Sequence, residues 1–276
     1  MTNDIKKHST PKIGIAFILV IIMQYFVVPF FVYSAFVVDN NLSQKYTYFH
    51  TIISYTIIIL SIIIFGDRGL DVFQDYFSLG IIALSCFLRA SLGGSDEIIY
   101  KSILAFLGVL LTIYMIHHRQ SIKLPRLKSV FIGLLCSIIT VLVLSSIHLL
   151  LVSNPGTIPP DSILMQYIAN MSIFHLSFIT VIEEAYFRGL VVGFLVMDGY
   201  KEDFALFVQG ILFWTIHYAK LNDPVLVFVL LPLFILVSAL MIKKFRTLYT
   251  TIILHTLNNV FGGILVTVFS RWLSHL

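Results

Sequence analysis

Charged residues are scarce in this chain, and their scarcity excludes an ordinary soluble protein. Only 12% of the 276 residues are Asp, Glu, Lys or Arg, whereas 58% are hydrophobic, and the mean hydropathy is +0.96. That is too little charge to cover the surface of a soluble domain of this length. The apolar residues also lack the alternation that is typical of strands in a membrane β-barrel, so the sequence predicts helices.

Cysteines and the familiar protease signatures are nearly absent as well. The two cysteines, Cys86 and Cys136, stand far apart inside apolar runs and match neither a disulfide framework nor a zinc-site spacing. The chain contains no His-Glu-x-x-His, no Gly-x-Ser-x-Gly and no pair of Gly-Asp aspartates within its apolar runs. The net charge of +4 comes from basic residues gathered in a few loops, so we expect no nucleic-acid partner.

What the chain does have is a series of long apolar runs. A run of about 18 or more apolar residues is typical of a membrane-spanning helix, because lipid offers the backbone no hydrogen-bond partner. The candidates are Ile13–Val38, Tyr48–Phe65, Phe77–Gly94, Tyr100–Ile116, Val130–Val152, Ile163–Val196, Phe204–Ala219, Pro224–Ile242 and Leu248–Ser270. The sixth run is too long for one simple crossing, so part of it should protrude or lie at the interface. The sequence therefore predicts an all-α, polytopic transmembrane helical bundle of about eight to nine spans.

The charges of the loops predict how these spans are oriented. Basic residues are concentrated in the loop 117–128 and in the turn 243–246, whereas the loop 154–161 has none. With a cytoplasmic N-terminus, nine spans place the basic loops inside and the other loops outside. We expect a multi-pass protein of the cell membrane, with an N-terminal group of spans (residues 1–153) and a C-terminal core (residues 154–276).

Polar side chains cluster in three of the C-terminal runs. They are Glu183, Glu184, Arg188, His217, His255 and Asn259. A charged residue at the centre of a span costs about 2.5–3.5 kcal/mol on insertion scales, so an intramembrane cluster indicates function. Because residues four apart share a helix face, Glu184 can pair with Arg188. The same spacing places Phe213 beside His217, and His255 beside Asn259.

The turn 197–203 predicts which of these side chains meet. Residue 200, at its centre, lies 17 residues from Glu183 and 17 residues from His217 (200 − 183 and 217 − 200). In an antiparallel hairpin, equal distance from the turn means equal depth, so we expect Glu183 and His217 to meet. His255 lies only about two turns into its run, and matching its depth would require a tilted, broken or extended helix.

Two kinds of hydrolytic site fit this set of residues. A carboxylate with a neighbouring histidine can hold and deprotonate a water, while a second histidine and an asparagine can donate hydrogen bonds to an oxyanion. Alternatively, Glu183, His217 and His255 form a complete ligand set for catalytic zinc. We interpret Arg89, His148 and His175 as structural or interfacial, because spacing gives them no matched partner.

Three motifs follow one another in this order: Glu183-Glu184-x-x-x-Arg188, Phe213-x-x-x-His217 and His255-x-x-x-Asn259. Together they resemble the motifs of the CaaX-protease and bacteriocin-processing (CPBP, or Abi) family of intramembrane proteases. The resemblance covers roughly Ile163 to Ser270. It implies an all-helical core around a cavity and a membrane-associated peptide or protein substrate.

The resemblance also implies roles for the residues. Glu183 would be the general base on the attacking water with the help of His217. His255 and Asn259 would stabilise the oxyanion, and Glu184, Arg188 and Phe213 would support the site. We expect no tightly bound metal, because a nearby arginine would compete with a metal's charge. A non-catalytic immunity or signalling partner of the same family, or a transporter, remains the alternative. A transporter would be favoured by inverted repeats, and the sequence shows none.

Overall fold

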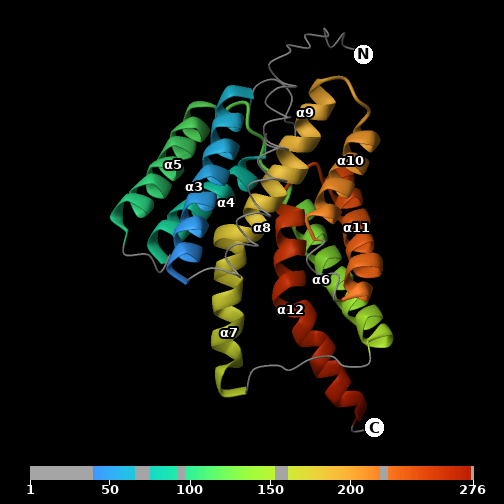
Figure 1. Ribbon diagram of the computed structural model, residues 1–276. Helices are drawn as coiled ribbons and strands as arrows, with labels where there is room; N and C mark the ends of the chain where they lie inside the picture. Colours follow the sequence, from blue (N-terminus) through green and yellow to red (C-terminus); the bar gives the residue numbers. More distant parts are fainter. Residues whose placement is uncertain (1–39, 66–74, 93–96, 153–160, 218–222, 275–276) are drawn as a thin grey trace.

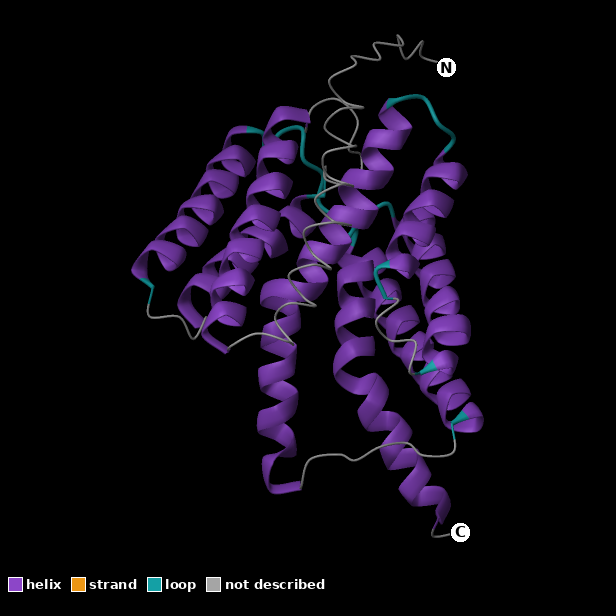
Figure 2. Cartoon of the chain, in the orientation of Figure 1, coloured by secondary structure: helices purple, strands orange, loops and turns teal. Residues whose placement is uncertain are grey.

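The computed structural model describes residues 40–65, 75–92, 97–152, 161–217 and 223–274, and throughout these ranges the regular structure is helical apart from one isolated bridge between residues 75 and 123 (Figures 1 and 2). The all-α prediction is therefore confirmed for the described part of the chain. The first predicted span, 13–38, lies outside these residues.

The helices follow the predicted apolar runs closely. In the N-terminal half they are α3 (Asn40–Phe65), α4 (Tyr76–Leu92), α5 (Ile98–His117) and α6 (Leu127–Leu151). Next comes one continuous helical rod, built from α7 (Asp161–Phe174), η3 (His175–Ile179), α8 (Thr180–Glu183), η4 (Glu184–Val191) and α9 (Val192–Met197). The last elements are α10 (Glu202–Thr215), η6 (Leu226–Leu230), α11 (Leu231–Phe245) and α12 (Tyr249–Ser274). We call the rod 161–197 the acidic helix; its segments η3 and η4 are π-helical.

Within the described residues, five segments are long and apolar enough to cross a membrane. They are Tyr48–Phe65, Ile98–His117, Leu127–Leu151, Leu226–Phe245 and Tyr249–Trp272, and each matches a predicted span. The helix α4 is apolar but has only 17 residues, and α10 has 14. The acidic helix runs as one bent rod along the height of the bundle (Figure 1). The chain is thus a multi-pass membrane protein by the length and composition of its helices.

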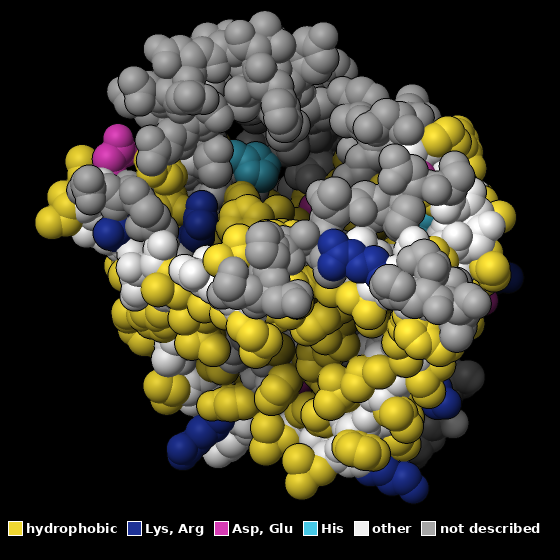
Figure 3. Space-filling view, turned by 90° about the horizontal axis from the view of Figure 1, so that it is seen from below, with side chains coloured by type: hydrophobic (Ala, Val, Ile, Leu, Met, Phe, Trp, Pro, Cys, Tyr) yellow, Lys and Arg dark blue, Asp and Glu magenta, His cyan; other side chains and the backbone are white. Residues whose placement is uncertain are grey.

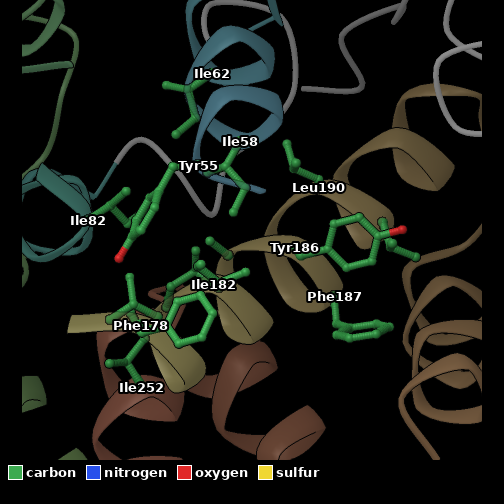
Figure 4. Close-up of a cluster of buried hydrophobic side chains, with 14 of the residues drawn as sticks. Tyr55, Ile58, Ile62, Ile82, Phe178, Ile182, Tyr186, Phe187, Leu190 and Ile252 are labelled. Atoms are coloured by element: carbon green, nitrogen blue, oxygen red, sulfur yellow. The ribbon is translucent and has the colours of Figure 1, made fainter. Parts of the chain in front are cut away.

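The acidic helix separates two groups of helices. In Figure 1, α3, α4 and α5 stand on one side of it, whereas α6, α10 and α11 stand on the other. Its face toward the first group is apolar: Figure 4 shows Phe178 and Ile182 in one buried cluster with Ile58 of α3 and Ile82 of α4. The charged residues of the acidic helix instead face α12 and the second group of helices.

The interface between α6 and α12 is built from small residues. On α6, Gly133, Ser137 and Ser145 are buried, whereas Phe131 and Ile139 are exposed. Small residues let two helix backbones approach closely in a membrane. The large apolar side chains of α6 are correspondingly on its other face, where they can contact lipid. Large apolar side chains are likewise widespread on the surface seen in Figure 3.

Three turns that the charge pattern places on one side of the membrane lie at the same end of the bundle. Arg246 pairs with Glu202 across 2.7 Å, and Lys243 pairs with Asp203, so the basic turn after α11 lies beside the α9–α10 turn. The backbone N–H of Tyr76 donates to the carbonyl oxygen of Lys123 (3.1 Å), so the α5–α6 loop lies beside the start of α4. This grouping agrees with the predicted orientation of the spans, in which the loop 117–128 and the turns 197–203 and 243–246 lie on the same side.

The turn between α11 and α12 is exposed at Arg246 but buried from Thr247 onward. Leu248 and Tyr249 are fully buried, and the backbone N–H of Tyr249 donates to Oγ of Ser78 (2.8 Å). Ser78 in turn donates to the carboxylate of Asp75 (2.7 Å), which caps the start of α4. Figure 1 shows the result: α12 begins well below the upper ends of α9 and α10. The buried start of α12 thus places His255 at the depth of Glu184.

The tight contact between α6 and α12 predicts that Gly133 tolerates no side chain. A Cβ at this position would lie 2.6 Å from Cγ2 of Thr250. We expect Gly133→Ala to lower the free energy of unfolding by about 1–3 kcal/mol through overpacking. Thermal unfolding in detergent measures this. The matched control is Gly80→Ala, whose Cβ would meet only Cε of Met115 at 3.9 Å and should not lower stability. Equal melting temperatures for the two variants would contradict the packing described.

Candidate active site

Glu184 is the centre of the polar cluster. It opens the π-helical segment η4, and one of its carboxylate oxygens, Oε1, accepts hydrogen bonds from two partners. One is the guanidinium of Arg188, which lies four residues later as the spacing predicts. The other is Nδ1 of His255 on α12, at 2.8 Å. Both Glu184 and Arg188 have no solvent-exposed side-chain surface, so the ion pair is completely buried.

Glu183 approaches the same histidine from its other side. Its Oε2 lies 3.7 Å from Nε2 of His255, and its side chain is 22% exposed, in contrast to the enclosed Glu184. His255 is therefore placed between two adjacent carboxylates, one sealed in the protein and one partly accessible. Spacing within single helices did not predict the contact between Glu184 and His255, because it joins residues 71 positions apart.

Aromatic rings surround this charged group. The guanidinium of Arg188 stacks over the ring of Phe213 (4.8 Å) and over that of Phe234 (5.6 Å). The ring of His255 lies 5.7 Å from the ring of Phe213 and 5.1 Å from that of Phe234. Cation–π attraction strengthens when the cation is removed from water, and low polarity strengthens the neighbouring hydrogen bonds. Phe213, the first residue of the second motif, thus packs against both Arg188 and His255.

The hairpin register predicted from residue 200 is confirmed at the aromatic pair Phe187 and Phe213. Each lies 13 residues from the centre of the turn (200 − 187 and 213 − 200), and their rings meet edge to face at 5.3 Å. His217 follows one turn later, beyond the end of α10, and its Nδ1 lies 2.8 Å from the carbonyl oxygen of Phe213. A carbonyl can only accept, so Nδ1 carries the proton and Nε2 is the acceptor. The direct meeting of Glu183 with His217 stays a prediction.

A cavity of about 210 Å³ opens between α6, α10, α11 and α12. Four of the predicted site residues line it: Phe213, His217, His255 and Asn259. Its remaining wall is largely apolar and consists of Leu144, Leu226, Val227, Leu230, Leu231 and Phe234, together with Ser145, His148, Asn258, Gly262 and Gly263. A mostly apolar cavity with a few convergent polar groups is the usual form of a binding site.

Two histidines that we interpreted as structural lie at this site. His175, on η3, has its Nδ1 at 3.4 Å from Nδ2 of Asn259. His148, near the end of α6, lines the cavity and lies 3.5 Å from the carboxylate of Asp223. No spacing rule in the sequence links either histidine to its partner, because both contacts join residues that are far apart in the chain. Arg89 lies elsewhere, where its Nε donates to the hydroxyl of Tyr100 (3.1 Å).

The geometry of the site does not form a zinc centre. Within the described residues, which include Glu183, His217 and His255, no three His, Cys, Asp or Glu side chains gather as ligands for a metal ion. Nδ1 of His255 is held by Glu184, and Nδ1 of His217 is held by a backbone carbonyl. Because the donors do not converge, we derive no catalytic step through a metal.

Residues 165–261 match the family model described as type II CAAX prenyl endopeptidase, Rce1-like. The match contains all three motifs and lies inside the region that carries the resemblance found in the sequence. No curated protein and no solved structure is significantly similar to the chain. The similarity to this family therefore rests on the matched segment and on the motifs that it contains.

The buried ion pair predicts a large cost for removing its cation. Arg188→Met keeps most of the side-chain volume but leaves Glu184 buried with an uncompensated charge, which should cost about 3–5 kcal/mol. The control is Arg246→Met, which removes the cation of the exposed pair with Glu202 and should cost about 0–1 kcal/mol. Thermal unfolding of both variants in the same detergent compares the costs. A melting temperature for Arg188→Met equal to that of the control would show that the pair does not stabilise the fold.

Proposed function

We propose that the domain at residues 165–261, which belongs to the Rce1-like family of type II CAAX prenyl endopeptidases, makes this chain an intramembrane endopeptidase. Its substrate is a membrane-associated peptide or protein, and Glu183 activates the water that cleaves the peptide bond. The observation that carries the proposal is the position of His255. It lies between the carboxylates of Glu183 and Glu184 and lines a cavity together with His217 and Asn259.

The first step uses the difference between the two carboxylates. Glu184 is engaged by Arg188 and by His255, so it holds the site together. Glu183 is the partly accessible carboxylate, and it accepts a proton from water as the water oxygen attacks the carbonyl carbon of the peptide. His217 assists from the cavity wall, since its Nε2 can accept a hydrogen bond from the same water.

The attack places a negative charge on the former carbonyl oxygen. Asn259 donates to this oxyanion through Nδ2, and His255 donates through Nε2 when both of its ring nitrogens are protonated. That state is electrostatically balanced, because the imidazolium and Arg188 offset Glu184 and the oxyanion once Glu183 has taken the proton of water. The aromatic rings of Phe213 and Phe234 exclude water from the charged group, so each of these interactions is stronger than it would be in solution.

The second step returns the proton. The tetrahedral intermediate collapses, the carbon–nitrogen bond breaks, and the leaving nitrogen takes the proton that Glu183 received from water. One water is consumed, a new carboxylic acid and a new amine are released, and Glu183 is again ionised. The chain's own residues supply every proton transfer in this cycle.

The apolar wall of the cavity fits a substrate that reaches the site from the bilayer. Leu226 and Leu230 line the same cavity as His217, His255 and Asn259, so an apolar peptide can lie with its scissile bond near Asn259. We also retain the finer topological proposals: about eight to nine spans, a cytoplasmic N-terminus in the cell membrane, and a division into residues 1–153 and a catalytic core, 154–276. Cysteine-accessibility labelling of the loop 154–161 and of the turn 243–246 would test this orientation.

Replacing the general base tests the activity. Glu183→Gln keeps the size of the side chain but cannot accept the proton of water, so it should reduce cleavage by about 10²–10⁴-fold. The assay uses purified protein in liposomes with a farnesylated peptide that ends in a CAAX sequence, and with a library of apolar peptides read by mass spectrometry. The control is Glu202→Gln, which makes the same change in an ion-paired glutamate at the end of the bundle and should keep full activity.

Other outcomes separate the alternatives. A non-catalytic immunity or signalling partner would retain its biological effect in the Glu183→Gln variant at normal expression. A transporter would move a labelled peptide across the liposome membrane intact. Either result, in the absence of cleavage by the unaltered protein, would overturn the proposed function.

Metal dependence has its own test. We expect purified protein prepared without chelator to contain less than about 0.1 equivalent of zinc by elemental analysis, and to retain its activity after dialysis against chelator, since Glu183, His217 and His255 do not converge as ligands. One equivalent of zinc per chain, with activity lost on its removal and restored on its return, would contradict this expectation.

A further inference from the structure

His175 is a polar residue of the acidic helix that the proposed reaction does not use. It is buried, it belongs to η3, and its Nδ1 lies 3.4 Å from Nδ2 of Asn259. The distance is at the long end for a hydrogen bond, as catalytic contacts often are before substrate binds. Asn259 itself lines the cavity, so its carboxamide is in contact with His175 on one side and with the cavity on the other.

The π-helical form of η3 is what directs His175 toward α12. Five residues overshoot a full turn of a regular α-helix by about 140°, so residues 175 and 180 would not share a face. In a π-helix the residues i and i+5 are joined by a hydrogen bond and lie one above the other. Thr180 accordingly contacts Thr256 of α12 (3.0 Å). His175 contacts Asn259, which lies about one turn after Thr256 along α12.

Two side-chain donors hold this wide turn. The hydroxyl of Thr180 donates to the carbonyl oxygen of His175 (2.7 Å), and the hydroxyl of Tyr55 on α3 donates to that of Ser177 (2.6 Å). Both carbonyls are buried, and an unpaired buried carbonyl is costly. The π-turn is thus stabilised from within the acidic helix and from a neighbouring span, which fixes the position of the His175 ring.

We propose that His175 is a positioning residue for Asn259, an inference that rests on the proposed function. The imidazole Nδ1 accepts one of the two hydrogens on Nδ2, which fixes the orientation of the carboxamide. The second hydrogen of Nδ2 then points to the cavity, where it donates to the oxyanion. Without this acceptor the carboxamide can rotate and present its oxygen to the oxyanion, which would be repulsive.

A pair of variants of nearly equal size separates this role from packing. His175→Asn keeps an acceptor, because Oδ1 of asparagine occupies the position of Nδ1 of histidine, whereas His175→Leu removes it. We expect His175→Leu to lower kcat by about 10–100-fold with KM within about threefold, since loss of a whole oxyanion donor costs about 10²–10³-fold. His175→Asn should recover kcat to within about threefold of the unaltered protein.

The control for a structural role is Thr256→Val. It removes the neighbouring polar contact between the same two helices while leaving His175 and Asn259 in place. It should lower the melting temperature and leave kcat within about twofold. Equal kcat values for His175→Leu and His175→Asn, whether both are reduced or both are normal, would overturn the proposal.

A spectroscopic measurement makes the test independent of activity. In protein labelled with ¹⁵N-asparagine, the side-chain signal of Asn259 is the one that disappears in Asn259→Ala. We expect the signal of one of the two Nδ2 protons of Asn259 to be shifted downfield in the unaltered protein and in His175→Asn. In His175→Leu this signal should return to the chemical shift of a carboxamide proton without that hydrogen bond. An Asn259 signal that does not respond to His175→Leu would overturn the positioning role. If the unaltered protein cleaves no peptide, the proposed function fails, and this signal alone decides whether His175 orients Asn259.

Discussion

A fully buried carboxylate must have its charge compensated, and the site is arranged around this requirement. Glu184 has no exposed side-chain surface, so it depends on the guanidinium of Arg188 and on the imidazole of His255. Each partner is in turn packed against Phe213. Because Glu184 fixes one ring nitrogen of His255, the other nitrogen faces Glu183. The arrangement of the reactive groups thus follows from neutralising one charge in a place that water does not reach.

Much of this could be predicted from the sequence, because it depends on local periodicity. The apolar runs predicted about eight to nine spans, and five of them coincide with helices of spanning length in the described residues. The spacing of Glu184 and Arg188 predicted their ion pair. The position of the turn near residue 200 predicted the register of a hairpin, which the contact between Phe187 and Phe213 confirms. In each case the prediction required only that the chain be helical and that the neighbouring helix be antiparallel, and the contacts form although Glu184, Phe187 and Arg188 lie in the π-helical segment η4.

The rest depends on irregular backbone, which periodicity does not reveal. His255 reaches Glu184 because the α11–α12 turn is buried against Ser78, so α12 begins inside the bundle. His175 reaches Asn259 because η3 is π-helical, which places a residue on a face that regular helical spacing would not give it. A sequence rule based on 3.6 residues per turn therefore places His255 too close to the end of its helix and gives His175 no partner.

The central claim, that water activated at this site attacks a peptide bond, is tested most directly by isotope labelling. The protein in liposomes is incubated with an apolar membrane peptide in water enriched in ¹⁸O, and the fragments are weighed by mass spectrometry. The account predicts one ¹⁸O atom in the new carboxyl group of the N-terminal fragment after a single turnover. Fragments without ¹⁸O, or peptide that is recovered intact on the other side of the membrane, would contradict it.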